Sequence, residues 1–294
     1  MRVTISGGSG LIGAALAQAL RSRGDEVTLL SRSERGGAIA WDPLSGPPPA
    51  HALDGRDAVV SLAGEPIAQR WTPPAREAIR RSRLEGTANL VAGIEACPER
   101  PRLLVGASAV GYYGDRGDEV LDESSAPGSD FLAELCVSWE RATLDGGARA
   151  GLRACVLRTG VVLDRRGGAL AKMLPPFRLG AGGPVAGGRQ YMSWIALADL
   201  VAMYLAALED ERWSGAINAT APAAVRNGDF ARALGRALHR PAFAPLPAIA
   251  LRLRYGQMAQ IVTDSQRALP ARALELGFEF RLAALDEALA AALS

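Results

Sequence analysis

The sequence predicts an α/β fold, in which a doubly wound parallel sheet is followed by a smaller C-terminal lobe. Short apolar runs alternate with amphipathic helical stretches over the first half of the chain, and a glycine-rich turn joins the first run to the first helix. After about residue 165 the chain becomes rich in Gly and Pro. A strand, a helix and a second strand within about 30 residues form a βαβ unit, which requires parallel strands and a right-handed crossover.

The first βαβ unit lies at the start of the chain. Residues 2–6, RVTIS, and residues 26–31, EVTLLS, are short apolar runs that predict buried strands. Between them, residues 11–24 form a helical stretch that ends at Gly24. Its apolar positions fall on one helical face: Leu11, Ala15, Leu16, Ala19 and Leu20.

The same alternation continues along the chain. Strands are predicted at 57–64, 102–108 and 152–160, and helices at about 74–95 and 130–144. Residues 40–55 are a Pro-rich connection. The later segments are expected as additions that build the lobe over the open edge of the sheet: 215–222, 276–280 and helices near 199–209 and 227–238. We assign residues 1–165 to the core, which also receives later elements near 190–220, and 166–294 mainly to the lobe.

Composition excludes several classes of protein. The chain has 294 residues, a net charge of +2 and scattered basic residues, so we expect no nucleic-acid partner. Its three cysteines, Cys97, Cys136 and Cys155, have no metal-ligand spacing, and we expect no metal. No apolar run approaches the roughly 20 residues of a membrane span. An odd cysteine count and the absence of a leader predict a cytoplasmic protein. A monomer or a homodimer is expected.

The turn after the first strand has the composition of a phosphate-binding loop. Residues 6–13, SGGSGLIG, carry Gly7, Gly10 and Gly13 between a strand and a helix. Gly7 permits a tight turn, Gly10 lets the backbone approach a pyrophosphate, and Gly13 lets the helix pack close to the sheet. The helix N-terminus then faces the anion. This context predicts a dinucleotide site.

The ends of the next two strands indicate which dinucleotide. Ser31 and Arg32 end the second strand, where an acidic residue would hold a free ribose hydroxyl and an Arg accommodates a 2′-phosphate. They favour NADP over NAD, although Arg32 is also compatible with a plain surface position. Residues 61–64, SLAG, end the third strand, where small side chains let a nucleoside lie against the backbone.

These pieces resemble the extended short-chain dehydrogenase/reductase superfamily. The match is closest to an atypical branch of NAD-dependent epimerase/dehydratase-like proteins, also described as cell-division-inhibitor-like nucleotide-sugar epimerases. It covers nearly the whole chain, and its residues are 62-LAGEPIAQRWT-72, 82-SRLEGT-87, 108-SAVGYYG-114, 158-RTGVVL-163, 168-GALAKMLPPFRLGAGGP-184, 187-GGRQYMSWI-195, 216-AINATAP-222, 233-ALGRALHRPAF-243 and 264-DSQRALP-270.

The resemblance implies a Rossmann core that binds NADP(H) and a small C-terminal lobe that shapes a substrate pocket. It assigns cofactor contacts to these residues: Gly7, Gly10, Leu11, Ile12, Gly13, Ser31, Arg32, Leu62, Ala63 and Gly64. Members of the superfamily exchange a proton through a Tyr that is acidified by a Lys four residues later. A phenol needs such a cation because its pKa lies near 10.

This catalytic pair is absent from the sequence. The single lysine is Lys172, and the residue four before it is Gly168. If the Glu of the relatives' Tyr-xxx-Lys-xxx-Glu pattern is aligned with Glu140, Leu132 and Cys136 occupy the two catalytic positions. Neither side chain can perform acid–base chemistry of that kind.

Ser108, Tyr112 and Tyr113, at the end of the fourth predicted strand, are the catalytic candidates that remain. A tyrosine there can donate a proton to a carbonyl while Ser108 positions it. The alternative is that one tyrosine packs against the cofactor and the other caps the sheet. Arg158 and Arg189 either bind an anion or form structural ion pairs.

The remaining candidates are weaker. Lys172 is expected to face solvent on a helix over 169–174, and no role is expected for His51 or His239. The preferred hypothesis is therefore an NADP(H)-dependent oxidoreductase or epimerase-like enzyme of the extended short-chain class without Tyr-xxx-Lys, acting on an unknown small molecule. The alternative is an NADP(H)-binding sensor or regulator without catalysis. Ordinary NAD-linked nucleotide-sugar epimerisation is disfavoured by Arg32 and by the missing lysine.

Overall fold

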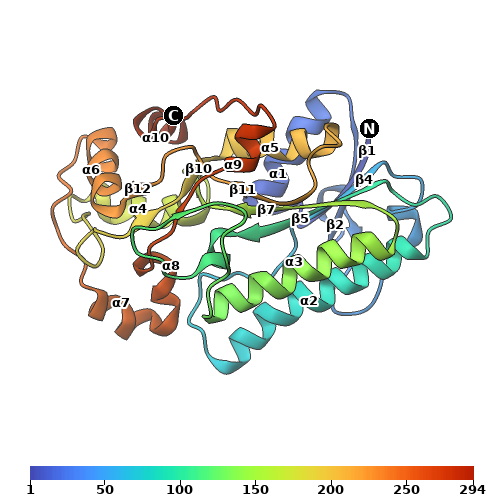
Figure 1. Ribbon diagram of the computed structural model, residues 1–294, viewed down its shortest axis with the longest axis horizontal. Helices are drawn as coiled ribbons and strands as arrows, with labels where there is room; N and C mark the ends of the chain where they lie inside the picture. The colour runs from blue at the N-terminus through green and yellow to red at the C-terminus, as the bar shows by residue number, and fades with distance from the viewer.

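A seven-stranded parallel sheet forms the centre of the molecule (Figure 1). The computed structural model describes residues 1–294, apart from the side chain of Arg35. The strands run in the order β11-β7-β5-β4-β1-β2-β3, and each neighbouring pair is parallel. Their bounds are β1 (Arg2–Ser6), β2 (Glu26–Ser31), β3 (Ile39–Ala40), β4 (Ala58–Ser61), β5 (Leu103–Ala109), β7 (Arg153–Thr159) and β11 (Gly215–Ala219). The predicted fold class is confirmed.

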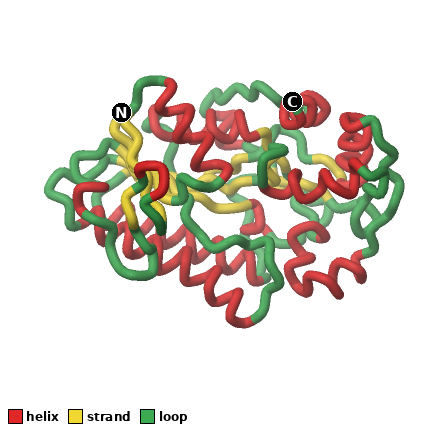
Figure 2. Tube along the Cα trace, turned by 180° about the vertical axis from the view of Figure 1, so that it is seen from behind, coloured by secondary structure: helices red, strands yellow, loops and turns green.

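Helices cover both faces of this sheet. α1 (Leu11–Ser22) and α5 (Leu197–Glu209) lie on one face, and α2 (Pro73–Glu95) and α3 (Phe131–Arg149) lie on the other (Figure 1). Seen from behind, the strands again lie between two helical layers (Figure 2). The apolar periodicity explains this arrangement, because Leu16 and Leu20 of α1 and Leu90 and Ile94 of α2 are buried.

Two of the helix starts are fixed by side-chain caps. Thr72 accepts a hydrogen bond from the Ala75 amide at the start of α2. Asp130 accepts from the amides of Leu132 and Ala133, at 2.8 and 3.1 Å, at the start of α3. Each cap satisfies helix amides that have no partner within the helix. The cap of α3 sets which of its residues face the end of the sheet.

Two later segments pack on the main sheet and its core. β11, which begins the segment 215–222, pairs with β7 as the edge strand of the main sheet, within the region near 190–220 that the core was expected to receive. Residues 276–280 contain no helix or strand; instead Phe278 and Phe280 pack against the core beside Trp213. Both segments are short and apolar, and a short apolar run does not reveal which surface will bury it.

The C-terminal lobe surrounds its own apolar cluster. α4 (Gly168–Arg178), α6 (Asn227–Leu238) and α10 (Leu285–Leu293) pack around Trp194 and Phe230. Two two-stranded ladders join segments on either side of residue 165: β8 (Val161–Leu163) with β10 (Trp194–Ala196), and β6 (Val120–Leu121) with β13 (Arg267–Ala268). A third ladder, β9 (Tyr191–Met192) with β12 (Val225–Arg226), lies after residue 165. The division of the chain at residue 165 stays a prediction.

The remaining helices are short. They are α7 (Ala248–Tyr255), α8 (Gln260–Thr263), α9 (Ala271–Glu275) and the 3-10 turns η1 (Arg35–Gly37), η2 (Ala50–Ala52), η3 (Val110–Tyr113) and η4 (Gly256–Ala259). α4 continues through Pro175 and Pro176, although a helix was expected only over 169–174. Burial of Leu174 and Phe177 in the lobe outweighs the hydrogen bonds that the prolines remove. None of the helices described here is long and apolar enough to span a bilayer.

Candidate functional site

Two adjoining cavities lie at the carboxyl end of the sheet. An outer cavity of about 270 Å³ is lined by residues that follow β1, β2 and β4. An inner cavity of about 490 Å³ is lined by residues of β5, α3 and the C-terminal lobe. Gly7, Gly10 and Leu62 line both cavities. Open α/β sheets bind ligands at this edge, at the point where the strand order reverses.

The glycine-rich loop forms the junction between the two cavities. Gly7 has φ = +75°, and a Cβ there would lie 2.7 Å from the Leu62 carbonyl carbon. A Cβ at Gly13 would lie 2.5 Å from the Gly7 carbonyl oxygen. Gly10 precedes α1 and has no side-chain cap, so the N-terminus of this helix is left open toward the inner cavity, which Leu11, Ile12 and Gly13 also line. Such a helix end attracts an anion.

The outer cavity has the features expected of an adenosine pocket. Ser31, Arg32, Ala63 and Gly64 line it, together with Trp41, whose indole N–H donates to the Gly46 carbonyl at 2.9 Å. The contribution of Trp41 was missed because residues 40–55 were interpreted only as a connection. A lone Trp in a Pro-rich loop was the signal available in the sequence.

The Asp42 carboxylate also lines the outer cavity. Hydrogen bonds from the Leu44 amide and the Ser45 hydroxyl, and to a smaller extent the charge of Arg32, lower the pKa of this carboxyl. Arg32 is exposed. Its guanidinium therefore remains accessible to an anion that enters the cavity.

The inner cavity is mostly apolar. Along β5, Ala107 and Ala109 line it, whereas Ser108 points to the other side, as the two-residue period of a strand requires. Leu132, Cys136 and Trp139 line it from successive turns of α3. Burial raises the pKa of the Cys136 thiol to about 12, so it stays neutral. The two positions aligned with the relatives' Tyr and Lys thus face the cavity, with side chains that carry no charge.

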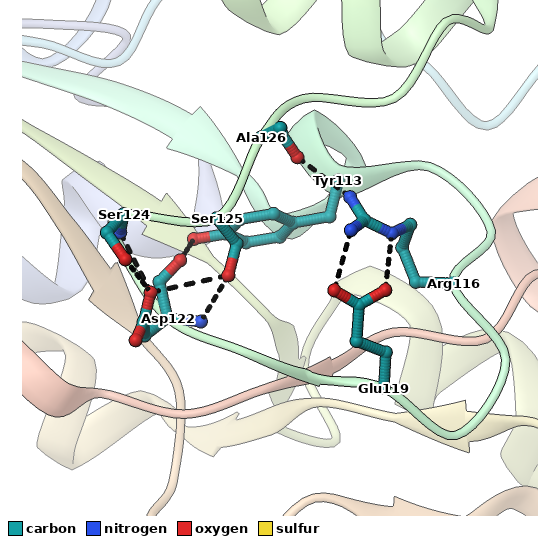
Figure 3. A network of polar contacts seen from close by, with 7 residues as sticks. All are labelled: Tyr113, Arg116, Glu119, Asp122, Ser124, Ser125 and Ala126. Atoms are coloured by element: carbon teal, nitrogen blue, oxygen red, sulfur yellow. Dashed lines mark hydrogen bonds and ion pairs between the residues drawn. The ribbon is translucent and has the colours of Figure 1, made fainter.

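The predicted catalytic residues lie behind the cavity wall. The Ser108 hydroxyl donates to Glu140 at 2.6 Å. Tyr113 is fully buried, its hydroxyl lies 2.7 Å from Asn218 Oδ1 and 2.9 Å from the Asp122 carbonyl, and burial raises its pKa to about 12. Figure 3 shows this hydroxyl pointing at Asp122. The Tyr112 ring packs under the guanidinium of Arg158, 3.5 Å from its carbon. These contacts favour packing over catalysis, and the catalytic assignment stays a prediction.

A loop next to Tyr113 is held by its own polar contacts. Arg116 forms two hydrogen bonds with the Glu119 carboxylate, at 2.7 and 2.8 Å, and a third with the Ala126 carbonyl (Figure 3). The Asp122 carboxylate accepts from the Ser124 hydroxyl at 2.6 Å. These contacts hold in place the Asp122 backbone carbonyl, which accepts a hydrogen bond from the Tyr113 hydroxyl.

Arg158 forms a structural ion pair, one of the two roles predicted for it. Its Nε and Nη2 donate to the Glu140 carboxylate at 2.9 and 2.8 Å, and both side chains are about 95% buried, with exposures of 5% and 6%. Nη1 reaches the Tyr113 hydroxyl at 3.0 Å. This network joins β5, β7, α3 and β11 directly behind the inner cavity. Arg189, Lys172 and His51 are exposed and line neither cavity.

Carboxyl groups gather where the lobe covers the inner cavity. Asp264 and Asp130 both line it. Burial, and then the charges of Asp115 and Asp130, raise the pKa of Asp264 to about 6. This residue was missed because it lies far along the chain from the core motifs. Within the described residues, no group of three or more His, Cys, Asp and Glu is placed to hold a metal ion.

A larger hollow of about 930 Å³ lies on the surface of the lobe, away from the end of the sheet. His239 lies at its edge, with Arg232 and Arg236 of α6. These arginines already pair with Asp229 and Asp286. The motifs, the open helix end and the cavities at the sheet edge therefore make the sheet edge the candidate site.

Comparison with known proteins finds relatives that match nearly the whole chain. The NAD dependent epimerase/dehydratase family matches residues 3–219, and a domain of unknown function (DUF1731) matches residues 246–292. The epimerase family protein Mb2239 of Mycobacterium bovis is 42% identical over 98% of this chain and 96% of its own. The chloroplastic SDR39U1 homolog of Arabidopsis thaliana is 40% identical over 99% of this chain and 86% of its own.

A solved structure supports the same comparison. The crystal structure of human epimerase family protein SDR39U1 with NADPH superposes with a TM-score of 0.90 at 38% identity. The match covers 99% of this chain and 98% of the human chain. The similarity therefore extends over core and lobe together.

The buried ion pair gives a prediction about stability. Replacing Glu140 by Gln leaves the Arg158 charge buried without its counter-charge, so the free energy of unfolding should fall by about 3 to 5 kcal/mol. Urea unfolding measures this. Glu134→Gln, an exposed position on the same helix, is the control and should change stability little. Equal effects at the two positions would contradict the role assigned to the pair.

Proposed function

The chain belongs to the NAD dependent epimerase/dehydratase family, and on this premise we propose that it is an NADP(H)-dependent oxidoreductase or epimerase-like enzyme of the extended short-chain class. One observation carries the proposal: the two adjoining cavities place Arg32 at one end, the open N-terminus of α1 in the middle and an inner cavity at the other end. This sequence of features matches a dinucleotide followed by a small substrate.

The chain's own groups support NADP(H) over NAD(H). Arg32 offers a planar fork that suits a phosphate on the ribose, and Ser31 adds a donor beside it. Trp41 gives the outer cavity a flat apolar wall against which a base can pack. The human relative was crystallised with NADPH. When bound, this cofactor supplies or accepts a hydride at its nicotinamide ring.

Proton transfer then has to use a group other than the Tyr-xxx-Lys pair. We propose Asp264, because it lines the inner cavity and its pKa of about 6 lies close to neutral. The same carboxyl, when protonated, donates a hydrogen bond to a substrate carbonyl. Tyr112, the donor predicted from the sequence, is the second choice, because its ring packs against Arg158 and it lines neither cavity.

A second candidate function is favoured by the neutral side chains at Leu132 and Cys136. A protein that kept the dinucleotide site and lost proton chemistry would act as an NADP(H)-binding sensor or regulator. It would bind NADPH and show no hydride transfer to any member of a carbonyl and nucleotide-sugar panel. We propose a cytoplasmic location and a monomeric or homodimeric state for the protein.

The cofactor proposal is tested by fluorescence titration with NADPH and NADH. The unaltered protein should prefer NADPH, and Arg32→Ala should weaken NADPH binding roughly ten- to hundredfold, because a charge-assisted contact to the 2′-phosphate is lost. NADH lacks that phosphate, so its affinity should not change. Arg80→Ala, an exposed arginine on α2, is the control variant. Failure of the unaltered protein to bind NADPH would refute the proposal.

The raised pKa of Asp264 predicts a pH-dependent difference in stability. The folded protein disfavours the charged carboxylate, so Asp264→Asn should be more stable than the unaltered chain at pH 7 to 8. The difference should be no more than about 1 kcal/mol, because the group is partly exposed. It should shrink as the pH falls from about 6 toward 4, where Asp264 becomes protonated.

Urea unfolding over this pH range measures the difference. Asp145→Asn, an exposed aspartate on α3, is the control and should show no such trend. Once a substrate is found, Asp264→Asn should also lower turnover. A stability gap that is independent of pH would count against a raised pKa at Asp264.

A further inference from the structure

The charges that line the inner cavity restrict the kind of substrate that it can hold. Among the described residues of its lining, Arg83 of α2 is the single cation. Two carboxyl groups, Asp130 and Asp264, line the same cavity. A nucleotide sugar carries a diphosphate, which proteins bind with several cationic or backbone donors. The charge balance of this lining is therefore unfavourable for an anionic substrate.

Arg83 is also held at a distance from the start of α3. A Cβ at Gly64, just after β4, would lie 3.1 Å from the guanidinium carbon, and Nη1 donates to two backbone carbonyls at 3.0 and 3.2 Å. The Trp139 ring of α3 lies 5.0 Å from the same carbon. Asp130 caps the start of this helix, about two and a half turns before Trp139. The cavity end at the start of α3 thus lies away from the single lining cation.

This end of the cavity is acidic. The charges of Asp115 and Asp130 act, after burial, to raise the pKa of Asp264 to about 6, so the three carboxyl groups lie near one another and Asp264 is ionised at pH 8. Arg252 of α7 acts in the opposite direction, but it is the smallest of the causes, and this arginine is exposed and does not line the cavity. An anion that enters here meets like charges.

The rest of the lining is mostly apolar. Aliphatic side chains reach the cavity from the loop after β4, from α3, from β8 and from α8: Ile67, Leu132, Leu135, Val161 and Ile261. The side-chain amides of Gln260 and Gln266 add neutral donors and acceptors from the lobe. The volume of about 490 Å³ has to hold a nicotinamide as well, and pockets for a single drug-sized ligand already span about 300 to 1,000 Å³. The substrate's share of the cavity is therefore small.

We propose that the substrate of the inner cavity is a small, neutral and largely apolar carbonyl compound or alcohol, and that nucleotide sugars do not bind there. The inference rests on the function proposed above and names its substrate class. The apolar body packs against the aliphatic wall, while the carbonyl or hydroxyl group meets Asp264 and the two glutamine amides. A carboxylate or phosphate in the same position would lie beside like charges.

The test uses ligands that differ in charge but hardly in shape. Phenyl-substituted methyl ketones of increasing chain length are paired with the carboxylates in which an oxygen replaces the methyl group. Each is titrated calorimetrically at pH 8 into protein saturated with NADP⁺, which cannot reduce a ketone. The best ketone should bind at least roughly tenfold more tightly than its carboxylate. UDP-glucose should show no binding at millimolar concentration.

Two substitutions relate this preference to named groups. Asp264→Asn removes one negative charge, so it should raise the carboxylate affinity roughly fivefold. Val161→Thr places a hydroxyl in the apolar wall without changing its shape, so it should weaken ketone binding roughly five- to tenfold. Asp145→Asn on α3 and Val120→Thr on β6 make the same changes at exposed positions, and both affinities should stay unchanged in these controls.

The outcomes separate this inference from the proposed function. If the protein binds NADP⁺ but no ketone, or binds the carboxylates or UDP-glucose more tightly than the ketones, the substrate class is wrong and the cofactor proposal stands. Unchanged affinities in both Asp264→Asn and Val161→Thr would mean that the ketone binds outside the inner cavity, which also overturns the inference. If the unaltered protein binds neither NADP⁺ nor NADPH, the proposed function itself fails.

Discussion

The buried ion pair between Arg158 and Glu140 is the interaction on which the geometry of the site depends. It joins β7 to α3, and through the Ser108 hydroxyl it also holds β5. Parallel strands leave their carboxyl ends open, since no hairpin fixes one strand end to the next. At that edge the Arg158–Glu140 pair, whose side chains are 5% and 6% exposed, takes the place of a hairpin. Its hydrogen bonds hold the end of β7 against α3. The apolar wall of the inner cavity lies directly on this support.

Successive side chains of β5 point to opposite faces of the sheet, so one set contacts the ion pair and the other lines the cavity. Ser108 faces the ion pair, whereas Ala107 and Ala109 face the cavity and leave a flat floor of small side chains. A planar ring can lie on such a floor, while larger side chains would displace it. The glycines of the phosphate loop, which follows the neighbouring strand β1, also keep the site free of side chains. Backbone atoms fill the space that side chains at Gly7 and Gly13 would need. The space for a ligand at this site is thus left by small side chains.

How much the sequence predicts depends on how far apart the participating residues are. The phosphate loop, Ser31 and Arg32 lie within a single βαβ unit, so local spacing was enough to place them. Trp41, Arg83 and Asp264 come from a loop, a helix and the lobe, and only packing brings them to the same edge of the sheet. Arg83 and Asp264 lie in stretches that carry the family resemblance, but the residues of those stretches do not show which cavity each side chain lines. For Tyr113 the sequence predicts the correct strand end, but the path of η3 turns its hydroxyl toward Asn218, away from the cavity. The two-residue alternation of side chains ends with β5 at Ala109, so it does not predict the direction of Tyr113, which lies in η3.

The division of polar groups between core and lobe has a consequence for mechanism. In the relatives' pattern the acid and its cation lie one helical turn apart, so a single helix fixes their geometry. Here the cation at the inner cavity, Arg83, is fixed to the core, whereas the titratable carboxyl, Asp264, belongs to the lobe and follows α8. Their separation therefore depends on how the lobe packs on the core through the β6–β13 and β8–β10 ladders. In the proposed function, the position of the acid relative to the core is therefore set by the packing of the lobe and not by a single helix.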